Sequence, residues 1–68
     1  MLTIGKAMRK CRRAKRISQK KLSDASGIEI SSISRYEREI TFPGILSLVA
    51  LADALGVSLD EYVGRSHT

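Results

Sequence analysis

The sequence contains one cysteine, one proline and one histidine among its 68 residues, and it has no tryptophan. The single cysteine, Cys11, excludes a disulfide bond within the chain and suits a reducing compartment, so we expect a cytoplasmic protein. One histidine and one cysteine are too few for a metal cluster or a catalytic triad, so we expect no enzyme, metal, cofactor or small-molecule substrate. No apolar run approaches the ~20 residues of a membrane span, and no segment resembles a signal peptide.

Positive charge is abundant instead, and it is concentrated in one half of the chain. The formal net charge is +5, with 43% apolar and 28% charged residues, a composition typical of a globular domain. Residues 1–38 hold eleven basic and three acidic residues, whereas residues 39–68 hold one basic and four acidic residues. This polarity favours a polyanionic partner at the basic end and self-association at the other end. A generic solvated basic surface is the simpler alternative.

Apolar residues recur at steps of three and four, which predicts helices and no strand. A chain of 68 residues forms one domain, which we place at residues 1–64, with residues 65–68 as a frayed tail that contains His67. We predict a helix that begins after Thr3, helices at about 19–26 and 29–38, a helix from Pro43 to about Leu55, and a short helix at 59–63. Serines are expected to cap two of these helices and glycines to end three: Ser18, Ser58, Gly27, Gly56 and Gly64.

The same spacing predicts which side chains face the core. They are Met8, Cys11 and Ala14 in the first helix, Leu22 and Ala25 in the second, Ile33 and Tyr36 in the third, and Ile45, Leu48, Leu51, Ala52 and Leu55 in the fourth. Core packing suits Cys11 better than redox sensing and suits Tyr36 better than base stacking. Leu46, Val49 and Ala50 fall on other faces of the fourth helix, which is either a wide buried stripe or a homodimer interface.

The predicted helix 29–38 is the most informative about function. With Ile33 inward, steps of 100° per residue turn two serines and two arginines outward: Ser31, Ser34, Arg35 and Arg38. Such a face, on a helix that follows a sharp turn and a basic helix, suits the major groove of DNA. There an arginine can donate two hydrogen bonds to guanine O6 and N7, and a small serine lets the backbone approach closely.

The run ISQKKLSDASGIEISSISRYE, at residues 17–37, resembles the helix-turn-helix of the phage Cro/CI-type repressors, the xenobiotic-response-element-like group. The resemblance extends over about residues 4–63, because Pro43 and residues from Leu48 to Leu59 follow the family's C-terminal pattern. It implies an all-α, five-helix, lambda-repressor-like domain that binds double-stranded DNA through the recognition helix 29–38.

The resemblance also implies roles for individual residues. The positions that contact bases are Glu29, Ile30, Ser31, Ser34 and Arg35, with Arg35 expected to bind guanine and Ile30 a thymine methyl group. The positions expected to bind phosphate are Gln19, Lys20, Lys21, Ser32, Arg38 and Thr41. Gln19 would also brace the recognition helix. Glu29 would either repel phosphates or accept a hydrogen bond from cytosine N4, and both alternatives stay open.

Arg12 and Glu37 match an inward ion pair of the family, which would hold the recognition helix at one angle. A solvated Arg12 is the alternative. Arg16 and Glu39 depart from the family pattern, because glycine usually ends the first and third helices there. A left-handed backbone costs a residue with a side chain roughly 1 kcal/mol, so we expect one or both loops to be rebuilt. Lys21 replaces the acidic residue of a capping box and so weakens the cap at Ser18.

These observations favour a sequence-specific transcriptional regulator, a repressor that binds a palindromic operator as a homodimer. The alternative is an antitoxin or adaptor module whose main partner is another protein, bound through the fourth helix. Binding of the first helix to a membrane surface is less favoured, because that helix lacks the large aromatic or leucine face of such binders.

Overall fold

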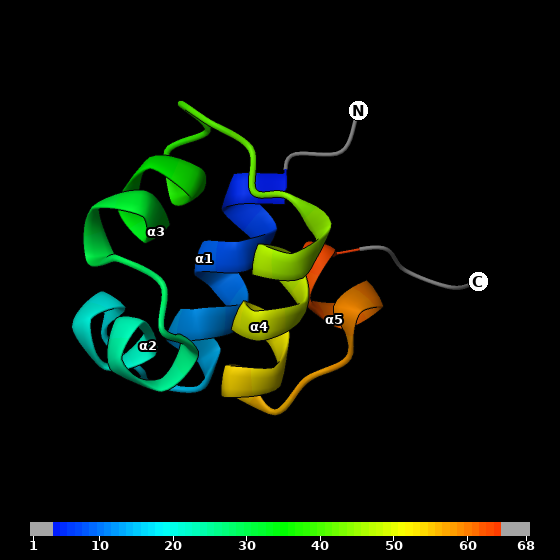
Figure 1. Cartoon of the computed structure of the whole chain (residues 1–68). Coiled ribbons are helices and arrows are strands. Elements are labelled where there is room, and N and C mark those ends of the chain that lie inside the picture. The colour runs from blue at the N-terminus through cyan, green and yellow to red at the C-terminus, as the bar shows by residue number, and fades with distance from the viewer. Residues whose placement is uncertain (1–3, 65–68) are drawn as a thin grey trace.

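The computed structural model describes residues 4–64, which form five helices and no strand (Figure 1). The helices are α1 (Ile4–Ala14), α2 (Gln19–Ser26), α3 (Ile30–Glu37), α4 (Ile45–Leu55) and α5 (Leu59–Val63). The all-α, five-helix prediction is therefore confirmed. The expected cap Thr3 and the expected tail 65–68, with His67, lie outside the described residues. Within the part described, no helix is long and apolar enough to cross a membrane.

As the sequence predicts, serines cap the beginnings of two helices and glycines follow the ends of three. The hydroxyl of Ser18 accepts a hydrogen bond from the backbone N–H of Lys21 at 3.0 Å, and that of Ser58 accepts one from the N–H of Glu61 at 3.1 Å. Glycines in the left-handed conformation follow α2, α4 and α5: Gly27, Gly56 and Gly64. Local sequence signals thus fix most of the helix boundaries.

Two helices are shorter than predicted. Helix α3 is one residue shorter at each end, because Glu29 and Arg38 are its flanking caps, and Glu29 makes no capping hydrogen bond with its side chain. Helix α4 begins at Ile45, since the carbonyl of Gly44 is the first to accept a helical hydrogen bond, from the N–H of Leu48 at 3.0 Å. Pro43 therefore lies before the helix and not in its first turn.

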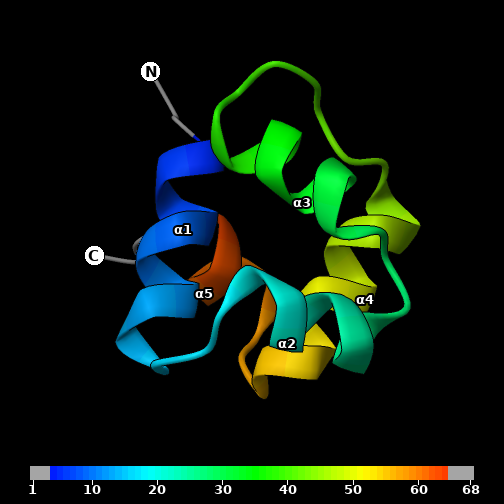
Figure 2. The same cartoon turned by 90° about the vertical axis from the view of Figure 1, so that its left-hand side faces the viewer.

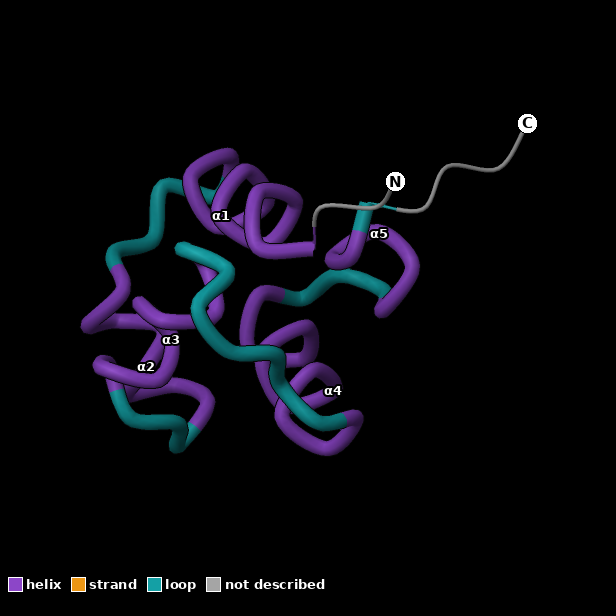
Figure 3. The backbone as a smooth tube through the Cα atoms, turned by 90° about the horizontal axis from the view of Figure 1, so that it is seen from above, coloured by secondary structure: helices purple, strands orange, loops and turns teal. Residues whose placement is uncertain are grey.

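Each helix contributes one fully buried side chain to a common core, namely Met8, Leu22, Ile33, Leu51 and Tyr62. Helix α1 packs against α3 and α5, α2 packs against α3 and α4, and α4 packs against α5 (Figure 3). Cys11 and Tyr36 are partly buried and pack against this core, in agreement with the sequence-based expectation.

Three residues that were expected to face the core are not buried there. Ala14 lies at the last position of α1, where the stripe of inward residues has already ended at Cys11. In α2 the inward direction runs from Leu22 to the half-buried Ser26, four residues later, so Ala25 turns to solvent. Ile45 is 62% exposed, because all the buried residues of α4 lie in its C-terminal half.

Helices α2 and α3 lie together on one flank of the molecule and α5 lies on the opposite flank (Figure 1), while α1 and α4 lie behind and in front of the core (Figure 3). Figure 2 views the side formed by α2 and α3, with α1 beside them. The basic half of the sequence therefore forms one side of the molecule, which contains the outward face of α3.

Candidate nucleic-acid interface

A tight turn joins α2 to α3. Gly27 has φ 77°, and only two residues separate it from the first residue of α3. Two serines of α2 stabilise the turn: the hydroxyl of Ser23 donates to the carbonyl of Ile28, and the N–H of Ile28 donates to the hydroxyl of Ser26 at 3.2 Å. The turn is therefore held by side chain–backbone hydrogen bonds, which fix where α3 begins relative to α2.

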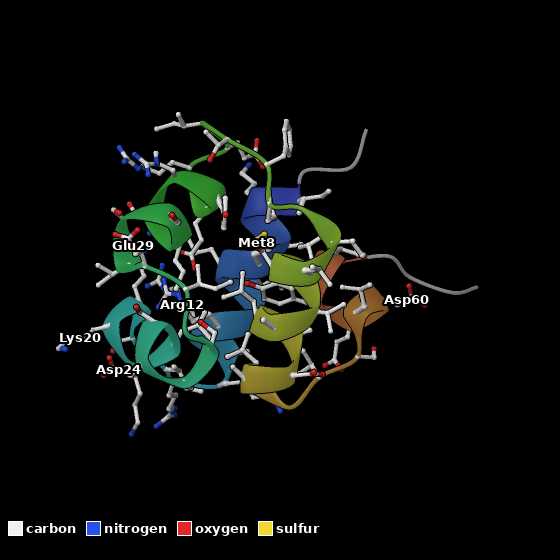
Figure 4. The ribbon with its side chains drawn as sticks, viewed as in Figure 1. Met8, Arg12, Lys20, Asp24, Glu29 and Asp60 are labelled. Atoms are coloured by element: carbon white, nitrogen blue, oxygen red, sulfur yellow. The ribbon has the colours of Figure 1, made fainter. Side chains whose placement is uncertain are left out.

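Helix α3 presents to solvent the face that sequence periodicity assigned to it. Ile33 and Glu37 are buried, so the opposite side of the helix faces outward. The exposed positions on and beside it are Glu29, Ile30, Ser31, Arg35 and Arg38, whereas Ser32 and Ser34 are half-buried. Glu29 lies on the outer side of α3 (Figure 4). Four of the five predicted base-contacting residues are therefore exposed, whereas Ser34, which was expected to face outward, is half-buried.

A buried network holds this surface in place. Arg12 Nε lies 2.7 Å from Glu37 Oε2, Arg12 Nη2 donates to Glu37 Oε1 at 3.0 Å, and Gln19 Nε2 donates to the same Oε1 at 3.0 Å. The side chains of Arg12 and Glu37 are only 11% and 2% exposed. The hydrogen bond with Glu37 raises the pKa of Arg12, against the opposite effect of burial.

Arg12 also reaches the connection between α1 and α2, which sequence reasoning did not predict. Its Nη1 donates to the carbonyl oxygen of Ile17 at 2.7 Å. The expected Arg12–Glu37 pair is therefore part of a larger network that joins α1, the α1–α2 connection, α2 and α3. Gln19 braces α3 by its bond to Glu37, whereas its binding of phosphate stays a prediction.

A hollow of about 200 Å³ lies where α1, α2 and α3 meet. It is lined by Arg9, Arg12, Gln19, Ser34, Glu37 and Arg38. The carboxylate of Glu37 is engaged by Arg12 and Gln19, so the exposed guanidiniums of Arg9 and Arg38 leave the hollow suited to an anion. Arg9 was not among the predicted site residues, although its position three residues before Arg12 places it on a neighbouring part of α1.

The remaining predicted phosphate-binding residues are at the surface. Lys20, Lys21 and Thr41 are exposed. Lys20 Nζ lies 3.8 Å from Asp24 Oδ2, with both side chains more than 70% exposed, at the outer side of α2 (Figure 4). Because an ion pair this exposed contributes little to stability, Lys20 can exchange Asp24 for a phosphate at small cost.

The two positions that depart from the family glycines keep the left-handed backbone. Arg16 has φ 58° and Glu39 has φ 62°, so the expected rebuilding of these loops did not occur. Glu39 has a compensating contact, because its Oε2 accepts a hydrogen bond from the backbone N–H of Lys6 at 3.3 Å. A Cβ at Gly5 would lie 2.5 Å from the carbonyl oxygen of Tyr36, which shows how closely α1 approaches the end of α3.

A second surface is apolar. The side chains of Ile40, Phe42, Ile45, Leu46 and Val49 are exposed on the α3–α4 loop and the first half of α4, and we call them the apolar patch. Leu46 is 83% exposed and Phe42 is 74% exposed, whereas Ala50 is half-buried. Sequence periodicity pointed to Leu46 and Val49 but missed Ile40 and Phe42, because loop residues have no helical period. Exposed apolar residues in such number are more typical of interaction surfaces than of a solvated surface.

Comparisons with known proteins agree with this geometry. The chain is 39% identical over 54 residues to the cryptic phage CTXphi transcriptional repressor RstR of Vibrio cholerae serotype O1, covering 79% of this chain and 48% of that protein. It is 33% identical over 64 residues to the SPbeta prophage-derived uncharacterized HTH-type transcriptional regulator YonR of Bacillus subtilis, covering 94% and 59%. The chain thus spans about half the length of these curated relatives.

A solved structure and a family model extend the comparison to the fold. The restriction-modification controller protein C.AhdI from Aeromonas hydrophila superposes with a TM-score of 0.85 and 30% identity, over 90% of this chain and 92% of that one. The helix-turn-helix family model matches residues 8–62, which include all of the buried network and the whole of α3. The chain is similar to these transcriptional regulators, and it belongs to the helix-turn-helix family of the phage Cro/CI type.

Proposed function

We propose that residues 1–64 form the DNA-binding domain of a repressor that binds a palindromic operator as a homodimer in the cytoplasm. Helix α3 lies in the major groove, and occupancy of the operator controls transcription. The observation that carries the proposal is the accessible face of α3, with Ile30, Ser31 and Arg35 in the solvent, held by a carboxylate that accepts three hydrogen bonds inside the protein. A rigid support of this kind suits sequence discrimination.

Base recognition falls to the exposed side chains of α3. Arg35 has an exposed guanidinium, which can donate two hydrogen bonds to one guanine, and the half-exposed Ile30 can contact a thymine methyl group. Ser31 contributes a hydroxyl close to the backbone, and Ser34 lies at the rim of the surface, beside the hollow. Glu29 precedes α3 without a capping bond, so its carboxylate is available to accept from cytosine N4.

Phosphate contacts surround this surface and position the domain without reading sequence. They come from the residues that the resemblance indicated, Gln19, Lys20, Lys21, Ser32, Arg38 and Thr41. The hollow with Arg9 and Arg38 at its edge supports a phosphate beside Gln19. If each subunit neutralises three or four phosphates, log K falls against log salt with a slope of about −5 to −7 for a dimer.

The apolar patch supports dimerisation, and it includes two of the residues that sequence periodicity pointed to, Leu46 and Val49. The third, Ala50, is half-buried. A twofold contact through this patch is self-complementary, as symmetric dimers require. The domain measures 34 × 24 × 21 Å, so two copies side by side are of a size that matches half-sites about 34–36 Å apart, one turn of DNA.

Selection from a random duplex pool, at two salt concentrations, tests the whole proposal. We expect an inverted repeat whose half-site centres are one turn apart. Arg35→Ala should relax the preference at one guanine of each half-site and cost roughly 1–3 kcal/mol. Lys20→Ala is the matched control, because it should weaken all sequences alike. An unchanged base preference in Arg35→Ala would show that this residue does not contact a base.

The dimer has a separate test. Leu46→Glu should turn a concentration-dependent dimer into a monomer in sedimentation experiments, because it places a charge at the most exposed side chain of the apolar patch. Asp53→Asn, an exposed substitution further along α4, is the control and should leave the assembly unchanged. A wild-type chain that stays monomeric at all concentrations, with or without the selected duplex, would refute the twofold contact.

A further inference from the structure

Helix α1 carries a row of cations on its outer side. Lys6, Arg9, Lys10 and Arg13 are all exposed and, with Ala14, line a broad surface hollow of about 560 Å³; we call the four cations the basic ridge. No acidic residue occurs within α1. Among residues 4–64, the salt bridges join Arg12 with Glu37 and Lys20 with Asp24, so neither of them neutralises the ridge.

The spacing of these cations is unfavourable for an isolated helix. Side chains three or four residues apart are neighbours on a helix surface, and like charges at these distances destabilise it. The ridge contains four such pairs, from Lys6 with Arg9 to Lys10 with Arg13. Because no ion pair within the described residues relieves this repulsion, a polyanion bound along α1 would stabilise the helix as well as gain affinity.

The ridge is continuous with the face of α3. Arg9 belongs to the ridge and also lines the hollow beside α3. That hollow is lined as well by Ser34 of α3 and by Arg38, the residue that caps the end of α3. The one acidic side chain in that hollow, Glu37, is already bound by Arg12 and Gln19, so cations pass from the outward face of α3 on to α1. Figure 2 shows α1 directly beside α3 on this side of the molecule.

We propose that the basic ridge binds the sugar–phosphate backbone of DNA outside the bases that α3 contacts, so that α1 lengthens the footprint of each subunit. This proposal rests on the proposed function, because it needs α3 in the major groove. The apolar side chains of α1, such as Met8, pack in the protein core, so the helix has no apolar face with which to enter a membrane. The exposed charges of the ridge are all positive, which suits phosphates.

Duplexes of two lengths separate this contact from general electrostatic attraction. The probe is the duplex recovered by selection from a random pool, used either trimmed to the recognised bases or extended by about ten base pairs, one helical turn, at each end. Arg13→Gln removes one charge of the ridge without touching the hollow beside α3. Lys15→Gln is the matched control, because it removes one charge just beyond α1 that does not line the ridge.

We expect Arg13→Gln to weaken binding of the extended duplex and to leave binding of the trimmed duplex unchanged. Between about 50 and 200 mM salt, the affinity of the variant for the extended duplex should fall about 3- to 4-fold less for each phosphate that it no longer binds. Lys15→Gln should behave as wild type on both duplexes. Lys6→Gln should reproduce Arg13→Gln, and the thermal midpoints of both ridge variants should equal that of wild type or exceed it.

Equal effects of Arg13→Gln and Lys15→Gln on both duplexes would overturn the proposal, since the ridge would then act only through net charge. So would a loss of binding to anionic vesicles in Arg13→Gln with binding of the extended duplex unchanged, which would indicate a lipid surface instead. If selection recovers no duplex at all, the proposed function fails. If selection succeeds and the ridge variants match wild type, only the role of α1 fails.

Discussion

Replacement of Arg12 by methionine tests directly how α3 is held in place. Methionine retains much of the aliphatic length of arginine but removes every donor. Glu37 would lose two of its three hydrogen bonds and keep only the one from Gln19, and the carbonyl of Ile17 would lose its partner on Arg12. A carboxylate that is 2% exposed would then carry its charge without a cation.

The size of the effect follows from this burial. Removal of one partner of a buried ion pair costs about 3–5 kcal/mol. A domain of 68 residues has a free energy of unfolding of only about 3–10 kcal/mol. Each kcal/mol of lost unfolding free energy lowers the thermal midpoint of a domain this small by about 4–8 °C. We therefore expect Arg12→Met to lower the midpoint by more than about 12 °C, and to leave the domain partly unfolded if its stability is at the lower end.

A double-mutant cycle with Glu37→Met isolates the pair. Replacement of both charges by apolar side chains removes the cost of burying them, so the double variant should recover most of the stability. The coupling energy should then be at least as large as the loss in one single variant, about 3–5 kcal/mol. Urea unfolding of the four proteins at about pH 7 provides the measurement. If the two single losses add within ~0.5 kcal/mol, the pair does not act as a unit and the reasoning is refuted. The recovered double variant should still discriminate less between operator and random duplex, because α3 has lost its polar support.

Four further substitutions test other parts of the fold. Gly5→Ala places a Cβ 2.5 Å from the carbonyl oxygen of Tyr36, so we expect a loss of about 1–3 kcal/mol in urea unfolding; an unchanged value would mean that the end of α3 moves aside freely. The hydroxyl of Tyr62 is buried and has no hydrogen-bond partner among residues 4–64, so Tyr62→Phe should be at least as stable at about pH 7. Burial raises the pKa of Tyr62 above the ordinary value of 10.0. The stabilisation that the protonated phenol gives to the folded state is therefore complete below about pH 10 and is lost as the pH rises toward the folded-state pKa. In unfolding experiments at several pH values, the wild type should lose more stability between about pH 9 and 11 than Tyr62→Phe does. Arg16→Gly should stabilise by about 0.5–1 kcal/mol by relieving the left-handed backbone, whereas Glu39→Gly should gain little, since it also loses the bond to α1; equal gains would show that the Glu39 bond has no value.

Sequence reasoning predicted those parts of the fold that depend on local signals. The ends of α2 and α5 follow from a serine before the helix and a glycine after it, and both lie where expected. The errors have a common cause. Periodicity defines a face of a helix but not the length over which a neighbouring helix covers it, so the expectation of burial was wrong for Ala14 and Ile45, which lie at helix ends and are exposed.

In the candidate site, too, features that follow from helical periodicity were predicted, whereas most contacts between distant residues were not. The outward face of α3 follows from the inward position of Ile33, because both belong to one helical period. Contacts between residues far apart in sequence were found only where the family pattern indicated them, as for Arg12 with Glu37. The bond from Lys6 to Glu39, 33 residues apart, and the exposed Phe42 in a loop have no periodic signal, and only the three-dimensional arrangement reveals them.

The two left-handed residues show how a departure from a family pattern can be compatible with the fold. A glycine at position 39 would fit the backbone without strain, yet its lack of a side chain would leave the first turn of α1 without the acceptor that Glu39 provides. Because Gly5 lets α1 approach the carbonyl groups at the end of α3, that acceptor lies within reach of Lys6 N. Two contacts thus hold α1 in place: Glu39, in the loop just after α3, binds its first turn, and Arg12 further along binds Glu37 of α3. A basic ridge on the outer side of such a doubly fixed helix would keep a constant position relative to the bases that α3 contacts, which a phosphate contact needs if it is to set the register of the domain on DNA.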